Sequence, residues 1–314
     1  MPTTDSLITG AINAVKREKN GSFKTRYNHI KGAIRFEKTL RELGYGVKKW
    51  CNITNKHVGA VVDRWKEEGL KAGTIKNYLS PVRIICKYHG NDRIHKDNKE
   101  FKIENRKNVT NKDKSLPQEV YEKVVKELKS NGDAHHQRVA AQLQLARELG
   151  LRVEESRKFS IIGLRQDGRV FISYGTKGGL DRFIHEPTEK GIDAIKYVKF
   201  LVGKSNLIPK NMSEAQWQKK YYSILKNYGI TKKDAGSSSH GLRHAYAQER
   251  YESMTGFKPP CKFESKQAFR INAENLKGAV WHKLDKDARL ILKSELGHGP
   301  ERDDVVSQYL GAAK

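Results

Sequence analysis

The chain has 314 residues, which is enough for two ordinary domains with a hydrophobic core each. Its 61 lysines and arginines outnumber 36 acidic residues and give a formal net charge of +25. Residues 1–110 hold 24 basic and 11 acidic residues, and the remainder holds 37 and 25. Because a disordered basic arm would concentrate the charge at one end, this spread favours two folded domains that both face a polyanion.

The composition argues against a membrane protein and against a disulfide-stabilised one. No apolar run approaches the roughly 20 residues that a membrane span needs, and the N-terminus lacks the apolar segment of a signal peptide. The three cysteines, Cys51, Cys86 and Cys261, lie far apart and are odd in number, so we expect reduced thiols. The sequence therefore predicts a cytoplasmic protein with no membrane partner.

Helical periodicity dominates the first hundred residues. Apolar residues recur at helical spacing in three stretches, at 25–43, 55–68 and 74–89. Pro81 lies inside the third stretch, and we expect it to kink or split that helix. Residues 1–22 are expected to be a polar lead-in with little order. The sequence predicts a helical domain at 1–100.

A charged, Asn-rich stretch with few apolar residues follows at 90–114. Such a composition is typical of a connection between domains. We place the linker itself at 101–114 and a second domain at 115–314.

The second domain combines helices with one β-hairpin. Strand-like residues at 170–174 and 181–185 flank the turn sequence Gly175–Gly179, which predicts a hairpin. Helices are expected from Ser115, with Ser as the cap and Pro117 in the first turn, at 133–150, 188–202, 213–228 and 287–297, and around Tyr309. Residues 255–286 resemble an insertion rather than a periodic element. The predicted fold class is mainly α with a small antiparallel sheet (α+β).

One stretch of this domain carries residues suited to chemistry on a phosphate. His240 and Arg243 are three residues apart, so on a helix they share one face. Ser237 to Ser239 are candidate N-cap residues, and the free N–H groups of a helix N-terminus favour a phosphate. A cation and an imidazole placed there could hold a phosphodiester and move a proton beside it. By itself, however, such a pair is common on solvated helix faces.

The order of several polar residues resembles the tyrosine recombinase (phage integrase) family. The matching strings are Leu149–Glu155, Gly175–Gly178, His240–His244, Leu296–His298 and Tyr309–Gly311. They contain the six residues Arg152, Lys177, His240, Arg243, His298 and Tyr309. The resemblance covers residues 115–314, which it identifies as a catalytic domain. Residues 1–100 look like the family's helical core-binding (SAM-like) domain, which binds DNA.

The resemblance implies a role for each of these residues. Arg152 and Arg243 would clamp the phosphate through bidentate hydrogen bonds, which needs neither a metal nor a cofactor. Tyr309 would be the nucleophile, His240 the candidate base, Lys177 the general acid and His298 a further donor to the phosphate. Glu155 is expected to hydrogen-bond beside the clamp and His244 to pack behind the site.

The function implied is site-specific recombination, by a 3′-phosphotyrosyl intermediate, for integration or excision of a mobile element. The implied partners are double-stranded DNA, further copies in a tetramer on two DNA sites, and accessory DNA-bending or directionality proteins. The implied location is the cytoplasm, on the nucleoid.

Three other functions remain open. A type IB topoisomerase-like strand transferase shares the chemistry, and a DNA-binding protein without catalysis shares the charge. A metal-dependent nuclease would use His240, His244, His298 and the pair Asp303–Asp304.

Overall fold

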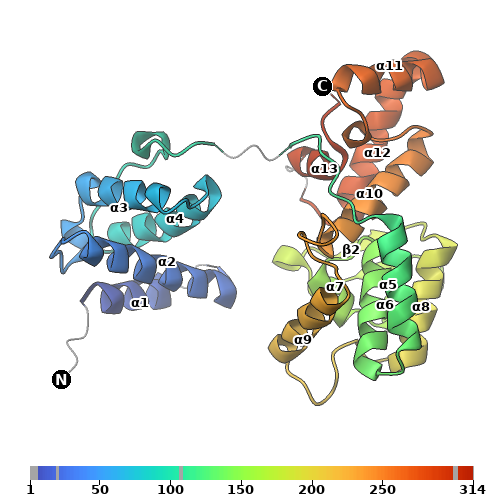
Figure 1. The fold of residues 1–314 in the computed structure, drawn as a ribbon, viewed down its shortest axis with the longest axis horizontal. Helices are drawn as coiled ribbons and strands as arrows, with labels where there is room; N and C mark the ends of the chain where they lie inside the picture. Colours follow the sequence, from blue (N-terminus) through green and yellow to red (C-terminus); the bar gives the residue numbers. More distant parts are fainter. Residues whose placement is uncertain (1–5, 19–20, 106–108, 300–302, 314) are drawn as a thin grey trace. The chain divides into compact units, whose positions relative to one another are not determined.

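The computed structural model describes residues 6–18, 21–105, 109–299 and 303–313. The chain divides into two units, Met1–Lys107 and Asn108–Lys314, and each is described by itself (Figure 1). Both units are mainly helical, and the strands among the described residues form one antiparallel pair in the second unit. The predicted fold class, mainly α with a small antiparallel sheet, is confirmed.

The first unit is a helical bundle with an aromatic core. Its elements are α1 (Ser6–Glu18), α2 (Phe23–Glu42), η1 (Trp50–Asn52), α3 (Asn55–Glu67), α4 (Ala72–Tyr88) and η2 (Lys99–Phe101). Two buried tryptophans also carry hydrogen bonds: the indole N–H of Trp50 donates to the Leu7 carbonyl at 2.7 Å, and that of Trp65 donates to the Thr39 hydroxyl at 3.0 Å. Because each buried indole N–H has an acceptor, burying these tryptophans leaves no unpaired polar group.

The expected lead-in at residues 1–22 and the expected split of the third helix at Pro81 are both wrong. Residues 6–18 form α1 instead of a lead-in, because Leu7, Ala11, Ala14 and Val15 fall on one face and are buried in the core. Helix α4 runs through Pro81 without a break. The ring of Pro81 is accommodated on α2 by Gly32, where a Cβ atom would lie 2.7 Å from the Pro81 Cγ.

The predicted linker contributes to both units. Phe101 and Ile103 are buried in the core of the first unit. Asn111 and Asp113 hydrogen-bond within the second unit. Residues 106–108, inside the predicted linker, lie outside the described residues.

The second unit is built around two buried helices. Its elements are α5 (Gln118–Ser130), α6 (Ala134–Glu148), α7 (Val153–Lys158), η3 (Ile161–Gly163), β1 (Val170–Ile172), η4 (Lys177–Gly179), β2 (Arg182–Ile184), α8 (Glu189–Val202), α9 (Glu214–Asn227), α10 (His240–Thr255), η5 (Pro260–Lys262), α11 (Lys266–Lys277), η6 (Gly278–Val280), α12 (Trp281–Glu295) and α13 (Asp303–Leu310). Helix α6 packs against α5, α8 and α10, and α10 packs also against α12 and α13. Ten of the 16 residues of α10 are buried, so most of its side chains pack inside this unit.

The predicted hairpin is confirmed. Strands β1 and β2 pair antiparallel with Val170 opposite Ile184 and Ile172 opposite Arg182. Gly175 in the turn has a φ of +77°, and a Cβ atom there would lie 2.8 Å from the Glu154 carbonyl oxygen. A side chain is therefore excluded at the point where the hairpin approaches α7.

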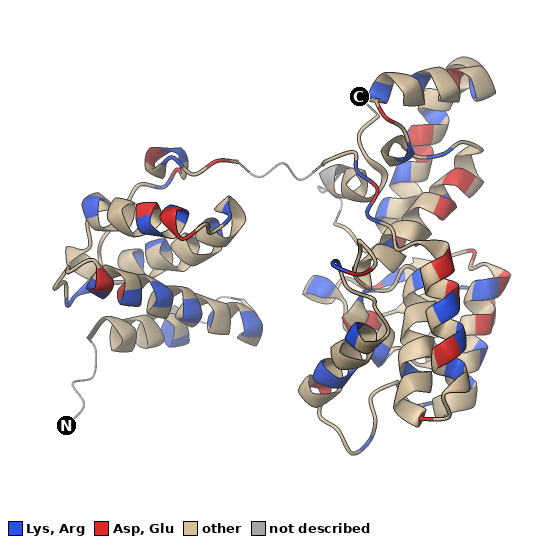
Figure 2. Ribbon diagram, viewed as in Figure 1, with Lys and Arg blue, Asp and Glu red and all other residues tan. Residues whose placement is uncertain are grey.

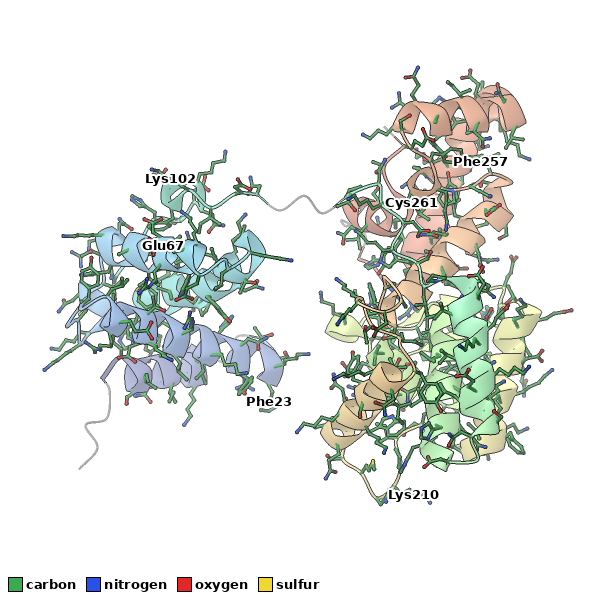
Figure 3. All side chains as sticks on the ribbon, in the orientation of Figure 1. Phe23, Glu67, Lys102, Lys210, Phe257 and Cys261 are labelled. Atoms are coloured by element: carbon green, nitrogen blue, oxygen red, sulfur yellow. The ribbon has the colours of Figure 1, made fainter. Side chains whose placement is uncertain are left out.

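Residues 255–286 contain a regular helix, which the sequence analysis did not expect. Helix α11 buries Phe269 and Ala273, and α12 begins at Trp281, ahead of the predicted start at 287. Phe257 and Cys261, both buried, lie in the loop between α10 and α11 (Figure 3). Whether this segment is an insertion relative to the family stays a prediction.

Basic side chains are distributed over the helices of both units (Figure 2). In the part of the chain that the structure describes, no helix combines the length and the apolar character that crossing a membrane requires.

Candidate active site

Helix α10 carries the most buried cation of the site. The Arg243 side chain is 1% exposed. Its guanidinium donates to the carbonyls of Gly150 and Leu296, and its Nε–H donates to the Tyr309 hydroxyl at 3.1 Å. These acceptors lie on three separate segments of the chain, so Arg243 is the point at which the segments meet.

The start of α10 differs from the prediction. Ser239 is the N-cap residue but makes no side-chain capping bond, and the Ser237 hydroxyl donates instead to the Lys114 carbonyl at 2.8 Å. The Gly241 and Leu242 N–H groups donate to the Ser238 and Ser239 carbonyls. The serine side chains therefore do not cap the helix as expected. The Ser237 hydroxyl is bound to the Lys114 carbonyl, and backbone hydrogen bonds form the first turn.

Arg152 lies directly before α7 and shares an acceptor with Arg243. Its guanidinium donates to the Leu296 carbonyl at 3.1 Å, and its side chain is 20% exposed. The other end of its fork donates to the Glu155 carboxylate at 2.7 Å. The two guanidiniums are thus held side by side, one buried and one partly open to solvent.

Glu155 is the buried carboxylate that balances this charge. It accepts hydrogen bonds from Arg152 and Arg182, and it lies 3.8 Å from the Arg243 guanidinium. Burial alone would raise the pKa of Glu155, but the hydrogen bonds and charge of Arg182, together with the charges of Arg243 and Arg152, lower it to about 2. Glu155 is therefore ionised at neutral pH and holds the cations in place.

Arg182 is the residue that the sequence analysis missed. It lies on β2, is 5% exposed, and donates to both carboxylate oxygens of Glu155 at 2.9 and 2.8 Å. Its Nε–H donates to the Glu295 carbonyl at 2.6 Å. One signal was available: Arg182 alternates with Ile184, so a cation occupies an inward-facing position of the strand.

The Tyr309 ring lies among three histidines. On α13 the side chain is 6% exposed, and its ring centroid is 4.7 Å from that of His244, 5.9 Å from that of His298 and 6.0 Å from that of His240. Five of the six residues predicted from the sequence, all but Lys177, therefore gather around the Tyr309 hydroxyl and the two guanidiniums.

The surroundings keep two of the histidines neutral. Desolvation of the ring, with the charges of Arg243, Arg152 and Lys114, lowers the pKa of His240 to about 4, although the residue as a whole is exposed. Burial and the neighbouring His240 and Lys114 lower the pKa of His244 to about 3. His240 is therefore neutral at pH 7 and free to accept a proton, but a pKa of about 4 makes it a weak base.

Lys177 is not brought to the other residues. It is exposed at the turn of the hairpin, in η4, and within the described residues it makes no hydrogen bond or ion pair.

Residues that precede the catalytic helices hold the backbone around Tyr309. The Gln248 amide donates to the Asp113 carboxylate at 2.9 Å and to the Tyr309 carbonyl at 3.4 Å. Asn111 accepts from the Ala312 N–H at 2.8 Å and donates to the Ala312 carbonyl at 3.3 Å. The segment 111–113 thus forms part of the support of α13.

The described residues bring together no group of three or more His, Cys, Asp or Glu side chains suited to a metal ion. The side chains of Asp303 and Asp304, considered above as metal ligands, lie outside the described part.

Both units match known protein families. Residues 6–95 match the family described as "Phage integrase, N-terminal", and residues 104–249 match "Integrase". The tyrosine recombinase XerC of Bacillus licheniformis is 27% identical over 158 residues, which are 49% of this chain and 50% of the relative. The chain therefore spans about half the length of the curated relative that it matches.

Solved integrase structures share the fold over nearly the whole chain. Lambda integrase bound to DNA has a TM-score of 0.62 at 15% identity and covers 98% of this chain and 95% of its own. The Tn1549 transposon integrase with transposon right end DNA has a TM-score of 0.60 at 15% identity, covering 98% and 96%. A lambda integrase tetramer bound to a Holliday junction has a TM-score of 0.55 at 17% identity, covering 91% and 79%.

Proposed function

Because the chain belongs to the phage integrase family of tyrosine recombinases, we propose that it is a site-specific recombinase that cuts and rejoins DNA strands. The observation that carries the proposal is the contact between the Tyr309 hydroxyl and the Nε–H of Arg243, beside a second guanidinium on Arg152. A phenol oxygen beside two fixed cations is suited to attack a phosphodiester while negative charge develops on the phosphate.

The reaction can be written with these side chains alone. The Tyr309 oxygen attacks phosphorus and its proton passes to neutral His240. A P–O bond forms to Tyr309 while the bond to the 5′-oxygen of the next nucleotide breaks. That oxygen takes a proton, for which Lys177 is the proposed donor. The product is a 3′-phosphotyrosyl link and a free 5′-hydroxyl, and attack by a second 5′-hydroxyl reverses the chemistry with little change in bond energy.

The clamp explains why arginine is suited to this site. A guanidinium stays protonated at working pH and matches two phosphate oxygens at once. Arg152 is partly exposed and can meet the phosphate directly. Arg243 is hydrogen-bonded to two carbonyls, and its buried positive charge stabilises negative charge on the phosphate without direct contact. His298, half-buried beside Tyr309, is the proposed further donor to the phosphate.

The proposed partners are duplex DNA and further copies of the chain. One structural neighbour, lambda integrase, is a tetramer on a Holliday junction, and we extend a tetramer on two DNA sites to this chain. Accessory DNA-bending or directionality proteins and a nucleoid location belong to the same proposal. A topoisomerase-like enzyme would act on one duplex without synapsis, so a product that joins strands of two duplexes separates the two functions.

The test is to trap the covalent intermediate and map it. The purified protein is incubated in EDTA with sheared DNA that includes the flanks of its gene, and denatured adducts are recovered and sequenced. Protease digestion should release a peptide that carries nucleotide on Tyr309. Adducts on another residue, or none from DNA that the protein binds, would refute the proposal; an absolute need for a divalent ion would favour the nuclease.

A further inference from the structure

We infer that Arg182 is a positioning residue that couples the hairpin bearing Lys177 to the guanidinium clamp. The inference rests on the proposed function and adds a residue to it. In this role Arg182 does not touch the DNA; it determines where other groups meet the DNA.

Arg182 joins three parts of the site through one side chain. Its two terminal nitrogens bind both oxygens of Glu155, which also holds Arg152. Its Nε–H binds the Glu295 carbonyl, one residue before the Leu296 carbonyl that both clamp guanidiniums share. Arg182 therefore fixes the start of α7 and the loop after α12 relative to each other.

The same loop is packed tightly against the Arg182 stem. Gly297 has a φ of +60°, and a Cβ atom on it would lie 2.9 Å from the Arg182 Cδ. The next residue is His298. A shift of Arg182 would thus reach His298 through the backbone as well as through the carbonyls.

Arg182 lies at the base of the turn that carries Lys177, so its position affects where Lys177 lies. The pair of Ile172 and Arg182 is the last of the ladder before the turn that carries Lys177. Gly175 fixes the other side of this turn against Glu154. The exposed lysine therefore extends from a base that is anchored by Arg182, and its reach toward a leaving oxygen depends on that anchor.

Lysine cannot replace arginine here, because the three acceptors lie in two directions. Glu155 needs a planar pair of N–H groups and Glu295 needs a third from Nε. An ammonium would keep the charge beside Glu155 but would release the Glu295 carbonyl. A displacement of about 1 Å in such a support can reduce a rate by about 10²-fold.

The experiment compares two leaving groups on the duplex recovered from adduct trapping. With oxygen at the 5′-bridging position the leaving group needs a proton. With sulfur there, it leaves as a thiolate, whose conjugate acid has a pKa of about 8.5, so the general acid is dispensable. The rate of covalent adduct formation on both duplexes is measured for the wild type, Arg182→Lys, Arg182→Gln, Lys177→Ala and, as a matched control, Arg169→Lys, whose exposed guanidinium pairs with Asp167.

For both Arg182 variants we expect about a 10²-fold loss on the oxygen substrate and a loss at least about tenfold smaller on the sulfur substrate. Lys177→Ala should lose rate on oxygen and recover on sulfur, and Arg169→Lys should match the wild type on both. The ratio of the two rates does not depend on the folded fraction of a variant, so partial unfolding cannot imitate the result.

Equal losses on the two substrates would overturn the inference, because Arg182 would then support only the clamp. Unchanged rates would overturn it as well. A wild type that forms no adduct on either duplex would refute the proposed function instead, and the two failures are distinguishable.

Discussion

Replacing Arg243 by lysine separates the charge of the clamp from its geometry. Arg243 serves three acceptors, the carbonyls of Gly150 and Leu296 and the Tyr309 hydroxyl, and it is almost completely buried. Each acceptor is bound by a different nitrogen of the guanidinium, and the single nitrogen of an ammonium cannot lie beside all three. The Leu296 carbonyl keeps its hydrogen bond from Arg152, so one of the other two acceptors is left buried without a donor.

The cost of that unpaired acceptor is about 1–3 kcal/mol of unfolding free energy. For a unit of this size it corresponds to a fall of about 2–12 °C in melting temperature. Catalysis should suffer more than stability, because an ammonium that serves one of the carbonyls no longer holds the Tyr309 hydroxyl, and a displacement of about 1 Å at a reacting group can cost about 10²-fold in rate. Binding to duplex DNA should change little, since the positive charge remains.

The assay measures adduct formation under single-turnover conditions at saturating protein, alongside melting temperature and duplex affinity. The control is Arg250→Lys on the same helix, whose guanidinium binds the carboxylate of Glu295, a partner that an ammonium can also pair. Near-normal cleavage by Arg243→Lys would refute Arg243 as a member of the clamp. An equal loss in the Arg250 control would attribute the defect to disturbance of α10.

Four further outcomes follow from the site. Tyr309→Phe should form no covalent adduct while duplex affinity stays within about twofold, and Tyr246→Phe, whose hydroxyl donates to Glu295 at 2.9 Å, should still form the adduct; a gel-resolved adduct in the first variant would contradict the assignment. With the pKa of His240 near 4, the cleavage rate should stay level from pH 8 to about 5.5, and a midpoint near 6.5 in the pH–rate profile would contradict the lowered pKa of His240. Because the pKa of Glu155 is lowered, its ionisation stabilises the fold by about 3 kcal/mol above about pH 4.5, and this contribution is lost as the pH falls toward 2. In Glu155→Gln the denaturant concentration at the unfolding midpoint should depend less on pH over that interval. Duplex affinity should fall about a thousandfold or more between about 50 and 200 mM salt if six or more phosphates are neutralised, and a flat response would mean that the charge of +25 serves another purpose.

The sequence predicts those parts of the site whose chemistry lies in short strings. His240 and Arg243 are one turn apart, so forming α10 was enough to bring them together. The hairpin and the helix of Tyr309 were also predictable, because turn residues and apolar spacing are local features. The catalytic roles of these residues stay predictions until the experiments above are done.

The parts that were missed depend on contacts between distant residues. Arg182 acquires its role only when β2 is placed beside Glu155 and Glu295, 27 and 113 residues away. Ser237 was taken for a cap because its competing partner, the Lys114 carbonyl, is 123 residues away. Helix α11 is different, because its signals are local: Ser265 caps it, and Phe269, Ala273 and Leu276 recur at helical spacing, so the sequence could have predicted it.

The Asn111 side chain has a consequence for how the protein can be dissected. Both of its amide atoms bind the backbone of Ala312, and two residues later Asp113 binds Gln248, which also contacts the Tyr309 carbonyl. The peptide that leads into the second unit therefore supports the helix that carries Tyr309. A fragment that begins at Ser115 would lack these contacts, so the shortest fragment that retains them begins at residue 111.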